Sequence, residues 1–459
     1  MKSVCWESAL RSRGEPSAWI SHPAVDLGLI SFGWIPLLMA FAWANQSADA
    51  EGWREALLVV VLVVNFLHRH ITFPLVYGDP EVFERRRRAY LGLPLLFACI
   101  AMASVSWVVN PRLVGAPMAE SFSLEDHAFV TIGFLREGQR SPPYKVDLSG
   151  TSTPDEVRDA FDADLEGLLI VGLDGSSLTL ELPPDTEDGG FILAGKKGAP
   201  ARLAIGLDEV DYEWFRPSRP LFTLLAAFSV IWTMYHVLMQ KYGLLRIYSR
   251  KSGRQTSRND LALVFAWFFA VFLSLLATHG VRDQLVRRFS EWRAIFDVAE
   301  PILGAMPAIA GLSVLFAVGV TVAYVRVELA GGSSGPKVAA IGSLMALYAA
   351  MFWDPEAGFL IFGFSHSIEY LAFVNVFSRR KYLRRAPDSS AMARAISLQP
   401  LSVGAFFVGG TAIYLFWAGQ SDLTLEWYIV GSSFLHFLYD GWIWKVSKPA
   451  VAEPLGIDG

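Results

Sequence analysis

The chain has very little cysteine and little charge for its length. Only two of its 459 residues are cysteines, Cys5 and Cys99, and they lie far apart, which predicts neither a disulfide framework nor a thiolate metal site. Charged residues make up 18% and the net charge is −5, so nucleic acid is not an expected partner. Glycine-rich phosphate loops, Cys-x-x-Cys pairs and His-Glu-x-x-His helices are also missing, which excludes the commonest nucleotide, redox and zinc-protease motifs.

The chain is instead rich in long apolar runs. Hydrophobic residues make up 53% and the mean hydropathy is +0.37, values typical of a polytopic membrane protein. A bilayer core about 30 Å thick needs roughly 20 mainly apolar residues per helix. The sequence therefore predicts an all-α polytopic membrane protein with about ten transmembrane helices, near 26–45, 55–76, 89–109, 219–240, 259–280, 302–325, 337–353, 356–377, 399–418 and 424–444.

Basic residues predict the orientation of these helices. Lys and Arg cluster after the second, fourth and eighth spans, at 85–88, 241–258 and 379–385. Loops rich in Lys and Arg usually remain in the cytoplasm. With ten spans, we expect both termini to be cytoplasmic.

About a hundred residues between the third and fourth spans have a different character. They are acidic and contain alternating runs that predict short strands, at 128–135, 144–148, 168–173, 177–182, 191–195 and 201–207. Thr153, Pro154 and the acidic residues after them predict a helix over 154–163. We therefore expect an inserted small α+β extracytoplasmic domain at 117–215, between membrane regions 1–116 and 216–459. Its one histidine, His127, indicates no chemistry, and we expect the domain either to bind a protein partner or to act as a lid.

Six of the eight histidines are expected at similar depth, in or beside the cytoplasmic half of the membrane. A single one is readily explained by a hydrogen bond to a carbonyl or by a position at the interface. Six on five different spans are harder to explain, because intramembrane polar groups are costly and imidazoles from separate helices can converge on one ion. We interpret them as candidate ligands of a shared metal site: His22, His68, His70, His236, His366 and His436.

Three of these histidines have a polar residue four positions later, on the same helix face. These residues are Asp26, Gln240 and Asp440. Metal-bound histidines commonly donate their second N–H to such an oxygen, which sets the tautomer. We expect these three residues to orient the histidines, although Asp440 could alternatively reach water or pair with Lys445.

The second and eighth spans leave choices open. His68 and His70 are about 200° apart around an α-helix, so both can face one centre only if Pro74 loosens the turn between them. In the eighth span, Glu369 and Tyr370 follow His366 at helical spacing and are candidate catalytic residues. A cross-helix hydrogen bond is the structural alternative for Glu369.

Four short motifs resemble the Brp/Blh-type membrane β-carotene 15,15′-dioxygenases. They are His22-Pro-Ala-Val-Asp26, the segment with His68 and His70, the run FSHSIEYLAFV around His366, and His436-Phe-Leu-Tyr-Asp440. The resemblance implies a bacterial inner (cytoplasmic) membrane enzyme with histidine-bound Fe²⁺. Tyr370 stands where that family has a second late histidine, and His236 or Glu369 could replace that ligand. The inserted domain has no counterpart in the family.

Two classes of function are therefore expected. The first is an iron-dependent oxygenase, which the resemblance implies is a dioxygenase. It would take a hydrophobic lipid-like or isoprenoid-like substrate from the membrane lipids into a pocket lined by aromatic residues such as Phe362, Phe364 and Trp442. The second is a proton-coupled transporter or channel that uses the buried His, Glu and Asp as a relay. Haem bound by two of the histidines is a third possibility.

Overall fold

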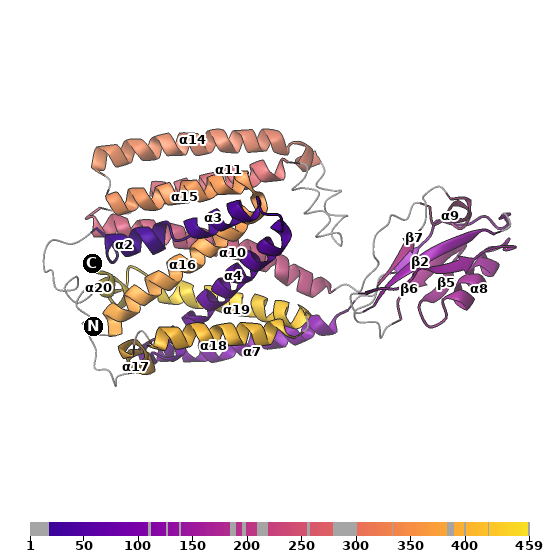
Figure 1. Cartoon of the computed structure of the whole chain (residues 1–459), viewed down its shortest axis with the longest axis horizontal. Coiled ribbons are helices and arrows are strands. Elements are labelled where there is room, and N and C mark those ends of the chain that lie inside the picture. Colours follow the sequence, from indigo (N-terminus) through magenta and orange to yellow (C-terminus); the bar gives the residue numbers. More distant parts are fainter. Residues whose placement is uncertain are drawn as a thin grey trace. The chain divides into compact units, whose positions relative to one another are not determined.

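The computed structural model separates into two compact units. It describes residues 18–108, 112–124, 127–136, 139–183, 190–194, 199–208, 219–254, 258–278, 301–332, 334–382, 390–398, 401–420 and 422–457. The first unit comprises Met1–Ala98 and Ala226–Gly459, and the second comprises Cys99–Leu225. Figure 1 shows helices in the first unit and both sheets in the second.

The second unit contains two antiparallel sheets and a capped helix. One sheet has the order β1 (Arg112–Val114), β6 (Ser177–Glu181) and β5 (Ile170–Asp174). In the other, β2 (Phe129–Arg136) pairs with β3 (Gln139–Arg140), β4 (Tyr144–Asp147) and β7 (Gly190–Ala194). Helix α8 (Pro154–Asp164) begins with a capping box between Thr153 and Glu156, and its Phe161 is buried in the core of the unit.

The structure confirms five of the six predicted strands and the predicted helix. The strand predicted at 201–207 is wrong, because helix α9 (Pro200–Ala204) begins there. The alternation of Ala201, Leu203 and Ile205 is typical of a strand. Ala201 and Ile205 are also one helical turn apart and both are buried, which suits a helix begun by Pro200.

The first unit is built from helices, most of them long. Its elements are α2 (Pro23–Val25), η2 (Asp26–Ser31), α3 (Ile35–Ala44), α4 (Ala50–His70), α5 (Thr72–Tyr77), α6 (Pro80–Glu84), α7 (Arg87–Ser106, which continues into the second unit), α10 (Pro220–Lys251), α11 (Arg258–Leu276), α14 (Met306–Gly331), α15 (Gly335–Trp353), α16 (Pro355–Tyr382), α17 (Ala391–Ser397), α18 (Leu401–Ala418), α19 (Asp422–Ile443) and α20 (Pro449–Leu455). Within the described ranges, seven helices are long and apolar enough to cross a membrane, or eight if a bent pair is counted as one span. The protein is therefore mostly helical and has the character of a multi-pass membrane protein.

The expected first span is the bent pair, with a 42° change of direction between Pro23–Ser31 and Ile35–Ala44. Gly33 lies at the bend, where an added Cβ would come 2.7 Å from the Leu29 carbonyl oxygen and 2.9 Å from Ile368. The close approach to α16 therefore requires glycine. The expected third and tenth spans correspond to helices α7 and α19. These two are not among the seven helices that are long and apolar enough to cross a membrane.

Helix α10 continues well past residue 240, where the fourth span was expected to end. Lys241, assigned above to a cytoplasmic loop, lies inside this helix and is 6% exposed. The assignment of Lys241 to a loop is wrong because its charge has a buried partner in the bundle, described below.

Helix α16 is the central element of the first unit. In its most apolar window 67% of the residues are buried, against 17% in α10 and in α14. Large apolar side chains on α14, such as Leu312 and Leu315, are instead about 70% exposed (68% and 70%), as lipid-facing positions would be. Polar residues on α16 are therefore the ones that the other helices can surround.

A buried carboxylate joins the end of α16 to α6. Asp79 Oδ2 accepts hydrogen bonds from Lys381 Nζ and from the Tyr382 hydroxyl, both at 2.7 Å, and Asp79 itself is 1% exposed. Burial alone would raise the pKa of Asp79, but these hydrogen bonds outweigh it and hold the pKa below its ordinary value.

We expect Asp79→Asn to lower the free energy of unfolding in detergent by about 3 kcal/mol, because it leaves the Lys381 charge without its partner. The folded-state pKa of Asp79 is lowered, so its contribution is complete above about pH 4, the pKa of an unfolded aspartate, and is lost as the pH falls through the lowered value. Glu81→Gln, which removes an exposed pair with Arg85, is the control and should cost under about 1 kcal/mol. Equal losses in the two variants would contradict the prediction.

Candidate metal centre

Four histidines from four different helices meet inside the first unit. His68 lies on α4, His236 on α10, His366 on α16 and His436 on α19, and one ligand atom from each lies within 4.8 Å of the other three. Three of the rings are nearly fully buried, and the side chain of His236 is 12% exposed. These four residues are called the histidine cluster below.

The rings of the histidine cluster pack edge to face. His68 lies 4.5 Å from His366 and 4.5 Å from His436 between ring centroids, and His236 lies 5.1 Å and 5.0 Å from the same two rings. The Nε2 atom of every ring is buried and has no hydrogen-bond partner among the described residues. Buried polar atoms normally have a partner, and four unsatisfied nitrogens so close together could share one metal ion.

Thr72 determines which nitrogen of His436 faces the cluster. The Thr72 hydroxyl donates to Asp440 Oδ1 at 3.0 Å and lies 2.8 Å from His436 Nδ1. Because the hydroxyl proton is directed at Asp440, Nδ1 must be the donor to the Thr72 oxygen. The lone pair of His436 is then on Nε2, the atom without a partner.

The choice between His68 and His70 follows from their hydrogen bonds. His68 Nδ1 lies 3.2 Å from the Asn65 carbonyl oxygen, which can only accept, so its lone pair is on the unsatisfied Nε2. His70 has both nitrogens occupied, with the Phe66 carbonyl at 2.6 Å and the Tyr428 hydroxyl at 2.7 Å. His68 therefore faces the cluster, and His70 joins α4 to α19.

Helix α4 ends at His70, and α5 begins two residues later at Thr72. Pro74 lies in the first turn of α5, but the break between the two helices does not turn His68 and His70 toward one centre. The interruption instead leaves Thr72 four residues after His68, where its hydroxyl reaches His436 on α19.

The first predicted motif lies elsewhere. His22 is exposed and caps α2, with its Nδ1 accepting from the Ala24 amide at 3.2 Å. The Asp26 carboxylate accepts from the amides of Ile20 at 2.7 Å and Ser21 at 3.0 Å, so it holds the chain that precedes the first bent span. The structure thus brings neither residue to the histidine cluster.

Asp440 is buried beside the cluster and does not pair with Lys445. Its Oδ1 accepts from the Tyr370 hydroxyl at 2.5 Å, and its Oδ2 lies 3.6 Å from His436 Nε2 and 3.9 Å from His236 Nε2. Tyr370 in turn accepts from Trp444 Nε1 at 2.9 Å. Tyr370 therefore supports Asp440, and His236 provides the fourth imidazole.

Glu369 is neutralised by a lysine that the sequence analysis placed in a loop. Lys241 Nζ donates to Glu369 Oε1 and, at 2.9 Å, to the Ser365 hydroxyl. Gln240 donates to the His366 carbonyl oxygen at 3.0 Å and approaches Glu369 at 3.5 Å. Gln240 therefore positions the backbone of the His366 turn rather than an imidazole N–H.

The charges around the cluster leave one carboxylate unbalanced. Lys241 and Glu369 cancel, whereas Asp440 has no Lys or Arg within ion-pair distance in the described part of the chain. A cation held by neutral imidazoles would have Asp440 Oδ2 beside it as a counter-charge. Four neutral nitrogen ligands suit zinc, copper, iron or nickel, so the residues present fit a metal without identifying it.

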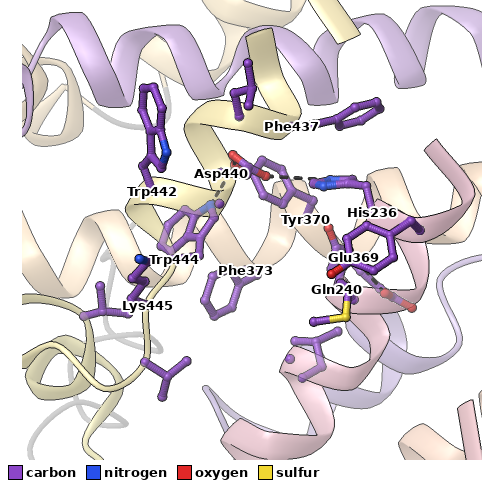
Figure 2. A pocket seen from close by; sticks show the side chains of 18 of the residues that line it. His236, Gln240, Glu369, Tyr370, Phe373, Phe437, Asp440, Trp442, Trp444 and Lys445 are labelled. Atoms are coloured by element: carbon purple, nitrogen blue, oxygen red, sulfur yellow. Dashed lines mark hydrogen bonds and ion pairs between the residues drawn. The ribbon is translucent and has the colours of Figure 1, made fainter. Parts of the chain in front are cut away.

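A cavity of about 560 Å³ adjoins the cluster, between α10, α16 and α19. Figure 2 shows His236 and Asp440 side by side on its wall, with Phe373 and Trp444 nearby. Its polar side chains are His236, Gln240, Glu369, Tyr370, Asp440 and Lys445, and most of the remaining wall is aromatic or aliphatic. Of the three aromatic residues predicted to line a pocket, Trp442 does so, whereas Phe362 and Phe364 pack around α15 and α16. The volume suits a small-molecule ligand.

The fold and site together define a helical membrane protein with a buried tetrahistidine site beside an apolar cavity. Comparisons with family models, with curated proteins and with solved structures find no match. The resemblance to Brp/Blh-type enzymes therefore rests on the short motifs, of which those at His68, His366 and His436 contribute to the cluster.

Two functional contacts escaped the sequence analysis. Thr72 carries no signal of its own, because a threonine in an apolar run is common. Lys241 was counted toward a basic loop, although its position five residues after His236, and the presence of a glutamate three residues after His366, could have suggested a buried ion pair.

We expect His68→Ala to remove most of the bound metal and His70→Ala to retain it, because only His68 directs a free nitrogen at the cluster. The measurement is metal content per chain of detergent-purified protein, with thermal stability recorded for both variants. Equal loss of metal from the two variants would contradict the assignment of His68.

Thr72→Val keeps the shape of the side chain and removes the hydroxyl that sets the His436 tautomer. We expect metal affinity to fall by about 10- to 100-fold, the usual effect of losing a group that orients a ligand. Thr321→Val is the control, because that hydroxyl is likewise hydrogen-bonded, to Trp267 and to the Ala317 carbonyl oxygen, but lies on α14. Unchanged affinity in Thr72→Val would show that the tautomer is set by other groups.

Proposed function

We propose that this protein is an integral-membrane, histidine-ligated non-haem iron oxygenase that acts on a hydrophobic substrate. The observation that carries the proposal is the convergence of four buried, unsatisfied imidazole nitrogens beside an apolar cavity. Imidazole ligands suit iron, and a cavity among apolar helices suits a substrate that enters from lipid. The Brp/Blh resemblance supports the choice of iron and of a dioxygenase reaction.

In this proposal His68, His236, His366 and His436 hold the metal. When bound, iron supplies the activation of O₂ that an oxygenase needs. Thr72 holds His436 in the tautomer that presents Nε2, and Asp440 stabilises the positive charge at the centre. The aromatic wall binds the substrate chain and excludes water beside His236.

Glu369 has a separate role in the proposal. It lines the cavity while its charge is held by Lys241 and Ser365, so it is placed to accept or return a proton during the reaction. Tyr370 keeps Asp440 in position through its hydroxyl. Glu369 is thus the candidate catalytic residue of the pair, and Tyr370 is a positioning residue.

The membrane arrangement completes the proposal. Helices α7 and α19 would join the seven apolar helices and the bent pair to make ten spans in a bacterial inner membrane, with both termini in the cytoplasm. The second unit would then be extracytoplasmic, where a protein partner can reach it. The histidine cluster would lie in the cytoplasmic half of the bilayer.

A proton-coupled transporter or channel is the second candidate. It is favoured by Glu369, Asp440 and His236 lining one cavity, because ionisable groups at membrane depth are typical of proton relays. In that case the imidazoles would exchange protons and hold no metal.

Metal analysis and an absorption spectrum of detergent-purified protein separate these candidates. We expect about one iron per chain, no haem Soret band, and severe loss of iron in His366→Ala and His436→Ala. His127→Ala, in the second unit, is the matched control and should keep its iron. Copurifying haem would replace the proposal with a haem protein, and a metal-free wild-type protein that takes up protons would favour the transporter.

A further inference from the structure

The cavity beside the histidine cluster has a charged end. Lys445, two residues beyond the end of α19, lines it and is exposed. His236 and Asp440 line the same cavity, and Figure 2 shows Trp444 between Lys445 and Asp440. The cavity wall therefore passes from the histidine cluster, over aromatic rings, to a cation.

A small neighbouring cleft extends the positive charge. It shares Trp442 and Val451 with the cavity. Its basic side chains are Arg85, Arg86, Lys381 and Lys448. Two of these are already neutralised, since Arg85 pairs with Glu81 at 2.6 Å and Lys381 with Asp79 at 2.7 Å. Arg86 lies over the Trp442 ring, 4.6 Å from its centroid.

Arg86, Lys445 and Lys448 together form what we call the basic rim. In the ranges that the structure describes, no carboxylate lies within ion-pair distance of any of the three. Partial burial and repulsion from Lys445, Arg85 and Arg86 lower the pKa of Lys448, so these cations are close enough to oppose one another. A bound anion would relieve this repulsion.

The distance between the rim and the cluster constrains the ligand. Asp440 lies inside α19 and beside the histidine cluster, whereas Lys445 lies beyond the end of that helix, at a different part of the cavity wall. A molecule whose anionic group is held at the rim would therefore place part of its chain, and not its headgroup, beside His236. Arg86 and Trp442 would contact the junction between headgroup and chain.

We propose that the substrate is an amphiphile with a carboxylate or phosphate headgroup bound by the basic rim and an apolar chain that fills the cavity. This inference rests on the proposed function, because it identifies the substrate class of the same site. It distinguishes an anionic lipid-like substrate from an uncharged hydrocarbon, which has no anionic group for the basic rim to bind.

The test measures equilibrium binding of four probes to the purified full-length protein in phosphatidylcholine nanodiscs: dodecyl phosphate, dodecanoate, dodecanol and inorganic phosphate. At least one of the two anionic amphiphiles should bind at least tenfold more tightly than dodecanol. Each of Arg86→Gln, Lys445→Gln and Lys448→Gln should weaken its binding by about fivefold, the usual contribution of one basic residue at a membrane surface. Arg326→Gln, on α14, removes an exposed cation that lines neither cavity and should have no effect.

Three results would overturn the proposal. The first is equal affinity for the anionic amphiphiles and for dodecanol. The second is a preference for anions that survives in the triple rim variant, which would mean general attraction to the surface. The third is inorganic phosphate binding as tightly as dodecyl phosphate, which would make the rim a site for free phosphate. A preference that discriminates dodecyl phosphate from dodecanoate identifies the headgroup.

Iron content of the same samples distinguishes this inference from the proposed function. The rim variants should keep their iron, because none of the three residues contacts the histidine cluster. A wild-type protein without iron that still prefers anionic amphiphiles would overturn the oxygenase and leave the rim as a binding site for a lipid-like anion. If the protein holds iron but does not prefer anionic amphiphiles, the proposed oxygenase stands and the proposed substrate class is wrong.

Discussion

The arrangement of the first unit depends on the cost of burying polar atoms where no water can reach them. Within a helical membrane bundle, each imidazole nitrogen, carboxylate and ammonium needs a partner from another helix. The Nε2 atoms of the histidine cluster have no protein partner among the described residues, and a shared metal ion could supply one. The Lys241–Glu369 pair and the contacts of Thr72 with His436 and Asp440 satisfy this requirement directly. Together these contacts specify how α4, α5, α10, α16 and α19 face one another.

Helix α16 shows how this requirement and the chemistry are combined. His366 and Glu369 lie on its most buried stretch, one as a member of the cluster and the other in an ion pair with α10. Ser367 on the same helix donates to the Asn65 side chain, while the Asn65 carbonyl accepts from His68. The central helix therefore contributes one histidine of the cluster and also supports the helix that carries another.

Much of this organisation could be predicted from the sequence, and the failures have physical causes. Apolar length predicts the helices. Histidine depth predicts six candidate ligands, of which four converge, whereas His22 and His70 do not. Periodicity alone could not choose between His68 and His70, because the choice depends on which nitrogens neighbouring carbonyls and hydroxyls already occupy. Lys241 was misplaced because a charge after an apolar run usually marks a span end, and a buried partner on another helix reverses that rule. The strand expected at 201–207 failed because its apolar spacing fits both periods.

Thr72 has a consequence for relatives of this chain. Its hydroxyl contacts His436 and Asp440 at once, and Thr72 itself begins α5, directly after the helix that carries His68. A change at position 72 to a residue without a hydroxyl would remove one of the donors to the carboxylate at 440 and free the ring at 436 to turn. Across evolution, positions 72 and 440 should therefore covary, and lineages that lose one should lose the residues of the histidine cluster soon afterwards.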